Sequence, residues 1–350
     1  MCEANSGDNR LISVASCLPY HGSTFMTYKD FSSVAIHEID KILALEGHVF
    51  WAVEIPTSSA SAVTLPFAWH SAGHGPLVTV IAGLHGNEWN SIACVAQVAT
   101  ALEGESLLGH VLCLPVLNLP AFRDRYRNSI SDQVDMNRVF DTFPQSSGPT
   151  SEIAMELWNR IIKRSDYVLD FHSAGDGDLV SQVRICSRKV FKLAASFMTE
   201  YVQFYDDLPN GFLIKACDES GIQAFGIELG KGLTLEDELI NQGINGVKNF
   251  LRAIGVLSGR AKTTTPRIVT SGLKVQADQL CLFWPKVTPG QLVKKGSSLG
   301  EAKVLESWSQ KQILAACDGT VLYVHRKGAA APLDTLIEIV GEEHVVKNHL

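Results

Sequence analysis

His85 and Glu88 stand three residues apart at the end of an apolar run, and together they could bind a metal ion. The run over residues 77–82 is rich in Val and Ile, which predicts a strand buried on both faces. An imidazole nitrogen and a carboxylate are two of the three protein ligands of a catalytic zinc site, whose fourth position stays open. The pair alone is a weak signal, because most His-x-x-Glu pairs are solvated surface groups.

Two further side chains that could bind a metal ion or transfer a proton lie at the ends of predicted strands. His172 closes a predicted strand over residues 166–172, and Glu228 lies near the end of another over residues 222–229. In open α/β sheets, ligands bind beyond the carboxyl ends of the strands. His172 is therefore a candidate third metal ligand, and Glu228 is a candidate general base. The alternatives are a core or capping histidine and a strand-terminal glutamate in a salt bridge.

Arginine is concentrated in one polar stretch between these strands. A charge run is usually a solvated face. Beside a metal ion, however, guanidinium groups can bind a carboxylate through two hydrogen bonds or stabilise an oxyanion. The stretch contains Arg123, Arg125, Arg127 and Arg138, with Asn137 next to the last of them.

The elements that must position these groups alternate between strands and helices. This alternation predicts an α/β domain with helices on both faces of a mixed sheet. Residues 121–143 show no clear periodicity and are predicted to be a loop. Strands are predicted at residues 49–55, 67–70, 77–82, 111–117, 166–172, 179–186 and 222–229, and helices at 89–102, 151–164, 190–201 and 234–254.

The pattern of apolar and turn-forming residues changes near residue 260. From residue 268 onward, short apolar runs are separated by Gly, Pro and Lys, which predicts a small all-β domain. We therefore place the catalytic domain at residues 1–260, with 1–30 as an irregular arm, and the β domain at residues 261–350.

Composition limits the classes of partner. The formal net charge of −7 argues against a general nucleic-acid binder. No run of about 20 apolar residues predicts a membrane span, and no signal peptide is visible at the N-terminus. The eight cysteines form no Cys-x-x-Cys pair and are expected to be reduced. These features predict a cytoplasmic protein, and they leave a homo-oligomer open.

Four motifs carry a resemblance to a known family. They occur in the order found in the succinylglutamate desuccinylase/aspartoacylase family, which is related to the zinc carboxypeptidases. The resemblance covers residues 45–255 and implies a mixed-sheet, zinc carboxypeptidase-like catalytic domain. The motifs are Gly-Leu-His-Gly-Asn-Glu at 83–88, Asp-Met-Asn-Arg-Val-Phe at 135–140, Asp-Phe-His at 170–172 and Ile-Glu-Leu-Gly at 227–230.

The resemblance also implies a role for each candidate residue. Glu228 corresponds to the catalytic carboxylate. Asn137 and Arg138 correspond to the pair that holds the α-carboxylate of the substrate. One Zn²⁺ ion per chain is implied, with His85, Glu88 and His172 as its ligands.

One further arginine of the family polarises the scissile carbonyl. Its best match is Arg127, ten positions before Asn137. The segment over residues 128–134 is slightly longer than in the best-known members, so Arg125 is the alternative. Arg184, on the predicted strand after His172, is a candidate for the pocket lining.

The β region has its own resemblance. Residues 287–300 and 313–323 resemble the paired halves of a lipoyl-like barrel-sandwich domain. Lys303 and Lys311 lack the sequence context of a modified lysine, so no swinging arm is expected. In the family this domain packs near the mouth of the active site and favours small substrates over peptides.

The resemblance implies zinc-dependent hydrolysis of the amide bond of a small, anionic N-acyl amino acid, with metal-activated water and a Glu general base. A metallocarboxypeptidase that acts on short peptides is the alternative enzyme. A non-catalytic binding protein that retains the fold is the alternative from another class. The sequence does not indicate which acyl group or amino acid is used.

Overall fold

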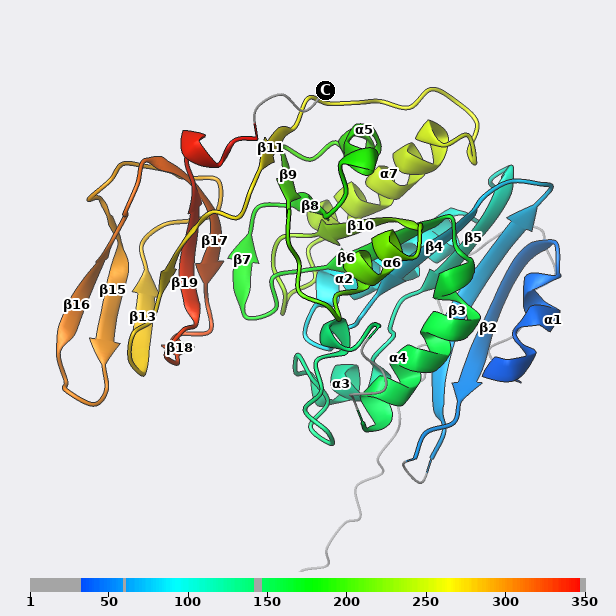
Figure 1. The fold of residues 1–350 in the computed structure, drawn as a ribbon, viewed down its shortest axis with the longest axis horizontal. Coiled ribbons are helices and arrows are strands. Elements are labelled where there is room, and N and C mark those ends of the chain that lie inside the picture. Colours follow the sequence, from blue (N-terminus) through cyan, green and yellow to red (C-terminus); the bar gives the residue numbers. More distant parts are fainter. Residues whose placement is uncertain (1–32, 59–60, 142–146, 347–350) are drawn as a thin grey trace, which may run out of the picture. The chain divides into compact units, whose positions relative to one another are not determined.

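The computed structural model describes residues 33–58, 61–141 and 147–346, so the predicted arm lies outside the described part of the chain. Its largest element is a ten-stranded mixed sheet in the order β1-β2-β3-β5-β4-β6-β10-β8-β9-β11 (Figure 1). The strands are β1 (Ser33–Ala35), β2 (Gly47–Ile55), β3 (Val63–Ala72), β4 (Leu77–Ala82), β5 (Gly109–Leu114), β6 (Tyr167–His172), β8 (Gln182–Ile185), β9 (Tyr201–Phe204), β10 (Gln223–Glu228) and β11 (Arg267–Val269).

The centre of this sheet is parallel. β4 pairs in parallel with β5 and β6, and β6 pairs in parallel with β10. Side chains of β4 alternate between two cores: Val80 and Ala82 join one, and Ile81 joins the other. The prediction of a strand buried on both faces is therefore confirmed. Because the three strands run in the same direction, their carboxyl ends lie at one edge of the sheet.

Helices cover both faces of the sheet (Figure 1). Residues of α2, α5 and α7 contribute to one core, and residues of α1, α4 and α6 contribute to the other. The predicted α/β class is thus confirmed. The helices are α1 (Asp40–Leu43), α2 (Trp89–Ala101), α3 (Leu119–Asp124), α4 (Pro149–Arg160), α5 (Phe191–Ala194), α6 (Leu213–Glu219) and α7 (Asp237–Ala253). No described helix has the length and apolar character needed to cross a membrane.

Three local predictions were wrong. The helix expected over residues 190–201 is reduced to α5 and adjoining 3-10 turns, because Met198 adopts a left-handed conformation and β9 begins at Tyr201. The strand expected over residues 179–186 is two strands, β7 (Gly177–Leu179) and β8. The loop expected from residue 121 lies partly in α3, whose first turn is capped by Asn118.

The C-terminal region forms two small antiparallel sheets around a shared apolar core. This confirms the predicted change to all-β structure, while the barrel-sandwich assignment stays a prediction. One sheet has the order β12-β19-β17-β14 and the other β16-β15-β13-β18. The strands are β12 (Leu273–Gln276), β13 (Cys281–Pro285), β14 (Leu292–Val293), β15 (Ser298–Val304), β16 (Gln310–Leu314), β17 (Gly319–His325), β18 (Ala329–Ala330) and β19 (Thr335–Val340).

The large sheet and one C-terminal sheet each include a strand from the other part of the chain. β7 leaves the neighbourhood of β8 and pairs antiparallel with β17, while β11 joins the large sheet beside β9. Two ion pairs, Arg326–Asp178 and Lys327–Asp176, tie the β7 segment to the end of β17. The predicted boundary between residues 260 and 261 stays a prediction. The pairing of β7 with β17 brings the C-terminal sheet to the carboxyl edge of the large sheet.

The cysteines of the described part of the chain are free, as predicted. Cys94 and Cys113 are buried beside each other in the core, and burial raises the pKa of both thiols. The other free thiols are Cys186, Cys217, Cys281 and Cys317. Cys2 and Cys17 lie outside the described residues.

Candidate metal centre and catalytic cavity

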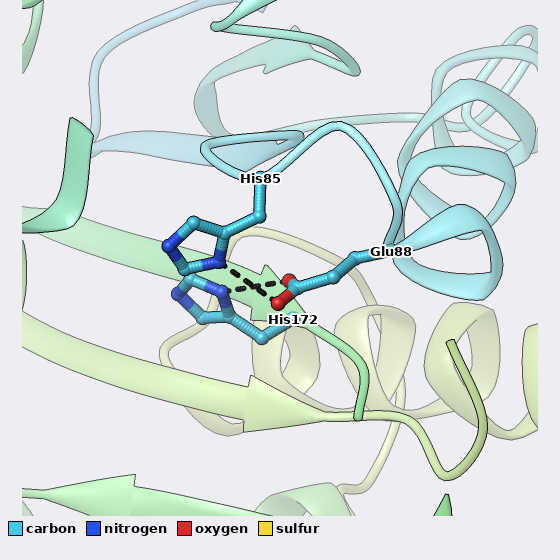
Figure 2. Close-up of side chains that lie close together, drawn as sticks. All are labelled: His85, Glu88 and His172. Atoms are coloured by element: carbon cyan, nitrogen blue, oxygen red, sulfur yellow. Dashed lines mark hydrogen bonds and ion pairs between the residues drawn. The ribbon is translucent and has the colours of Figure 1, made fainter. Parts of the chain in front are cut away.

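The side chain of Glu88 points toward two neighbouring histidine rings at the carboxyl edge of the sheet (Figure 2). Nδ1 of His85 lies 2.8 Å from Oε1 of Glu88, and Nδ1 of His172 lies 3.0 Å from Oε2. All three residues are buried, and their candidate ligand atoms lie within 4.8 Å of one another. The structure therefore brings together the three residues that the sequence analysis proposed as ligands.

The loop after β4 holds this geometry through two glycines. Gly83 has a φ of +69°, which favours glycine. Gly86 packs so closely against α3 that an added Cβ would lie 2.0 Å from the backbone of Ala121. A larger residue at either position would displace the loop, which places His85 over the sheet edge and Glu88 at the start of α2.

Each histidine also contacts a second carboxylate through its other ring nitrogen. Nε2 of His85 lies 3.1 Å from Oδ1 of Asp135, and Nε2 of His172 lies 2.9 Å from Oδ2 of Asp170. Metal-binding histidines usually donate their second N–H to such a partner, which orients the ring and fixes its tautomer. Both Nδ1 atoms are thereby directed at one point beside Glu88, as a shared cation requires.

The electrostatics of the cluster also suit a cation. Burial by itself raises the pKa of the Glu88 carboxyl, but the two imidazoles outweigh burial and hold it well below its usual range. Burial lowers the pKa of His172, yet Asp170 and Glu88 together raise it above its ordinary value. The carboxylates of Asp170 and Glu88 thus stabilise positive charge at His172. Two imidazoles and one carboxylate are a donor set that zinc accepts.

Glu228 ends β10 next to His172, its partner in the parallel register with β6. One carboxylate oxygen, Oε1, forms an ion pair with Nη1 of Arg184 on β8. Gly226 lies opposite Arg184 in the β10–β8 register, where the absence of a side chain leaves room for the arginine. The other oxygen, Oε2, is buried and accepts no hydrogen bond from the described residues. That oxygen is the acceptor a general base needs.

The structure separates the two candidate arginines of the loop. Arg127 lines the cavity beside His85, Glu88 and His172, with Nη2 2.9 Å from Oδ2 of Asp135 and Nη1 3.8 Å from Oε1 of Glu88. Arg125 is the left-handed residue that ends α3, and it is not among the described residues that line this cavity. The position of Arg127 favours it over Arg125.

Asn137 and Arg138 follow Asp135 in the chain and line the same cavity. Oδ1 of Asn137 accepts a hydrogen bond from the backbone N–H of Leu213, which fixes its side chain. The guanidinium of Arg138 stacks 3.7 Å from the ring centre of Phe212. Burial, reinforced by the neighbouring Arg127, lowers the pKa of Arg138 despite Asp135. A concentration of guanidinium groups in one cavity favours an anionic ligand.

All seven predicted site residues line one cavity of about 320 Å³. Its wall includes Arg184, as the sequence analysis suggested, and Tyr205. The C-terminal sheet closes it with Lys274 on β12, Tyr323 on β17 and Glu338 on β19. The predicted residues are His85, Glu88, Arg127, Asn137, Arg138, His172 and Glu228.

Comparison with known families decides the classification. Residues 74–254 match the succinylglutamate desuccinylase/aspartoacylase catalytic domain, which is more than half of the chain. The chain belongs to this family. The family resemblance drawn from the four motifs is thereby confirmed.

One similar protein is a named deacetylase. The N-alpha-acetyl-L-2,4-diaminobutyric acid deacetylase of Halomonas elongata is 28% identical over 211 residues, which cover 58% of this chain and 61% of the deacetylase. The match therefore spans about three fifths of that relative's length.

Solved structures of the family show the same fold. The succinylglutamate desuccinylase/aspartoacylase from Rhodobacter sphaeroides aligns with a TM-score of 0.76 at 23% identity, covering 85% of this chain and 96% of that chain. The product-bound ectoine utilization protein EutE (DoeB) from Ruegeria pomeroyi aligns with a TM-score of 0.77 at 23% identity and the same coverages.

Several residues of this cavity were not identified as site residues from the sequence. Asp135 and Asp170 were quoted within motifs but given no role, although both begin the motif that carries an assigned residue two positions later. Lys274, Tyr323 and Glu338 were not identified. They lie in the β region, whose approach to the cavity depends on pairing between distant strands.

Proposed function

We propose that this protein hydrolyses the amide bond of a small N-acyl amino acid in a zinc-dependent reaction. The observation that carries the proposal is the buried His85–Glu88–His172 cluster, with both rings oriented by outer carboxylates and facing the same cavity as Glu228. Family membership and the deacetylase from Halomonas elongata support this reaction class. The cytoplasmic location and a homo-oligomeric state stay predictions.

His85, Glu88 and His172 would hold one zinc ion. Zinc in such a site supplies Lewis acidity, which lowers the pKa of water to about 7 and polarises a carbonyl. Asp135 and Asp170 keep the two imidazoles directed at the site, because each accepts the N–H of the far ring nitrogen.

Glu228 is the general base in this proposal. Oε2 accepts a proton from the water that attacks the acyl carbonyl, and it then gives that proton to the departing amine nitrogen. Arg184 holds Oε1 through the ion pair, which orients the carboxylate without occupying Oε2. The products are a carboxylic acid and a free amino acid, so atoms and protons balance.

The arginines bind the negative charges of the substrate. Arg127, held by Asp135, stabilises the charge that develops on the carbonyl oxygen. Asn137 and Arg138 bind the α-carboxylate of the amino acid, where a planar guanidinium forms two parallel hydrogen bonds. The three contacts fix the amide between the zinc site and Glu228.

The size of the cavity favours a single N-acyl amino acid. A volume of about 320 Å³ lies at the small end of ligand pockets, and the C-terminal sheet closes one side. The alternatives remain a metallocarboxypeptidase acting on short peptides and a binding protein without catalysis. The named substrate of the deacetylase relative makes N-acetyl diamino acids part of the panel that separates these functions.

The test is release of free amine from a panel of N-acetyl and N-succinyl amino acids and one dipeptide, with and without a chelator. Chelator-sensitive cleavage of an N-acyl amino acid supports the proposal. Cleavage of the dipeptide alone supports the carboxypeptidase. No cleavage by the zinc-loaded protein supports the binding protein.

Arg127→Met is expected to lower kcat about 10²- to 10³-fold, because one donor to a developing oxyanion contributes that much. Arg125→Met is the matched control, since Arg125 ends α3 outside the cavity, and it should keep turnover within about twofold. Steady-state kinetics on the best substrate measures both variants. A loss in Arg125→Met with normal turnover in Arg127→Met would reverse the assignment.

A further inference from the structure

Glu338 is a buried carboxylate in the cavity wall for which the proposed mechanism has no use. It lies on β19 of the C-terminal sheet, and only 8% of its surface is exposed. Oε1 accepts hydrogen bonds from Nε2 of Gln203 at 3.1 Å and from the backbone N–H of Gly272 at 2.9 Å. No described residue donates a hydrogen bond to Oε2. One oxygen is therefore fixed by the protein, and the other is left for a ligand.

The two donors form a built support for this carboxylate. An added Cβ at Gly272 would lie 2.5 Å from the carbonyl oxygen of Ile339 and 3.0 Å from Cγ of Glu338. Glycine thus lets the backbone N–H approach the carboxylate. Gln203 is itself held by the hydroxyl of Tyr205, which donates to Oε1 of Gln203 at 2.7 Å and lines the same cavity.

The charge of Glu338 has no ion-pair partner in the described part of the chain. Arg184 is near enough for Glu338 to contribute to its raised pKa, but its ion pair goes to Glu228. Lys274 is the cross-strand neighbour of Glu338 on β12, yet it is exposed and forms no ion pair with it in the described structure. A buried carboxylate without a cation is costly, so the cavity is suited to a ligand that brings one.

We propose that Glu338 binds an ammonium group on the side chain of the N-acyl amino acid. This inference rests on the proposed function and names its substrate class: N-α-acyl derivatives of diamino acids. Arg138 and Asn137 hold the α-carboxylate, and Glu338 in the C-terminal sheet holds the opposite charge of the side chain. The C-terminal sheet then selects the substrate as well as closing the cavity.

The test compares the N-α-acetyl derivatives of diaminobutyrate, norvaline and glutamate on the zinc-loaded full chain. The side chains of diaminobutyrate and norvaline have the same number of non-hydrogen atoms and differ in charge, and glutamate brings the opposite charge. A charge-assisted hydrogen bond predicts that kcat/KM for the cationic substrate exceeds that for norvaline about 10- to 100-fold. Glutamate should be the poorest of the three. This comparison uses the unaltered protein, so it does not depend on the folding of any variant.

Glu338→Gln keeps the shape of the side chain and an oxygen for Gln203 and Gly272, but it removes the charge. It should abolish the preference for diaminobutyrate while the norvaline derivative stays within about twofold. Glu342→Gln is the matched control, because Glu342 is exposed and pairs with Arg267 away from the cavity. It should leave all three values unchanged.

Two results would overturn the proposal. One is a wild-type preference for the glutamate derivative that Lys274→Met removes, which would assign the subsite to Lys274 and to an anion. The other is an equal loss for all three substrates in Glu338→Gln, which would show a structural role only. If none of these three N-acetyl derivatives is cleaved, calorimetric binding of the free amino acids decides, while the proposed function is judged on the wider panel of N-acyl amino acids. Tighter binding of diaminobutyrate than norvaline, lost in Glu338→Gln, supports the subsite, and equal binding refutes it.

Discussion

Glu228→Gln is expected to lower kcat about 10²- to 10⁴-fold, the range typical of a lost general acid–base group. Glutamine cannot accept the proton of the attacking water, although its oxygen can still accept a hydrogen bond from Arg184. The fold and the metal cluster should be preserved, because Glu228 is not within the ligand set of His85, Glu88 and His172. Steady-state kinetics on the best substrate, with zinc content measured by atomic absorption, checks both statements.

Glu238→Gln is the matched control for this experiment. Glu238 is exposed in the first turn of α7, so its replacement should leave kcat within about twofold of the wild-type value. Equal turnover of Glu228→Gln and the wild type would contradict the proposed mechanism. A Glu228→Gln variant that loses both zinc and turnover would instead assign Glu228 to the metal site.

His172→Ala is expected to abolish tight zinc binding and, with it, turnover. Loss of an outer carboxylate partner costs about 10- to 100-fold in metal affinity, and loss of a direct ligand should cost more. Asp170→Asn provides the intermediate case, because it removes the charge that orients His172 but keeps the ligand. Competition with a fluorescent zinc chelator should rank the affinities as wild type, then Asp170→Asn, then His172→Ala.

The control for this series is His74→Ala, since His74 is exposed and is not part of the described cluster. It should bind zinc as tightly as the wild type. Zinc should also raise the melting temperature of the wild type and of His74→Ala, because a ligand that binds only the native state stabilises it. Wild-type zinc affinity in His172→Ala would remove His172 from the ligand set.

Local sequence was sufficient to predict the elements that carry the candidate metal ligands. The apolar side chains of β4 point to both faces of the strand, so both faces must be buried away from water. A parallel strand in the middle of a sheet supplies that environment. Gly83 and Gly86 mark the close backbone approach that follows it. His172 and Glu228 end buried strands, so parallel pairing alone brings them to the same edge as His85 and Glu88.

The sequence alone thus determined the fold class, the candidate ligands and the candidate base, because each depends on patterns within a few residues. Tertiary structure decided the rest. Arg127 and Arg125 are only two positions apart in the sequence. Arg125 ends α3 in a left-handed conformation, and Arg127 lines the cavity. Arg184 reaches Glu228 because β8 pairs antiparallel with β10. Glu338 reaches the cavity because β7 pairs with β17, about 150 residues later in the chain. Hydrophobic periodicity specifies which face of a strand is buried, but not which distant strand pairs with it.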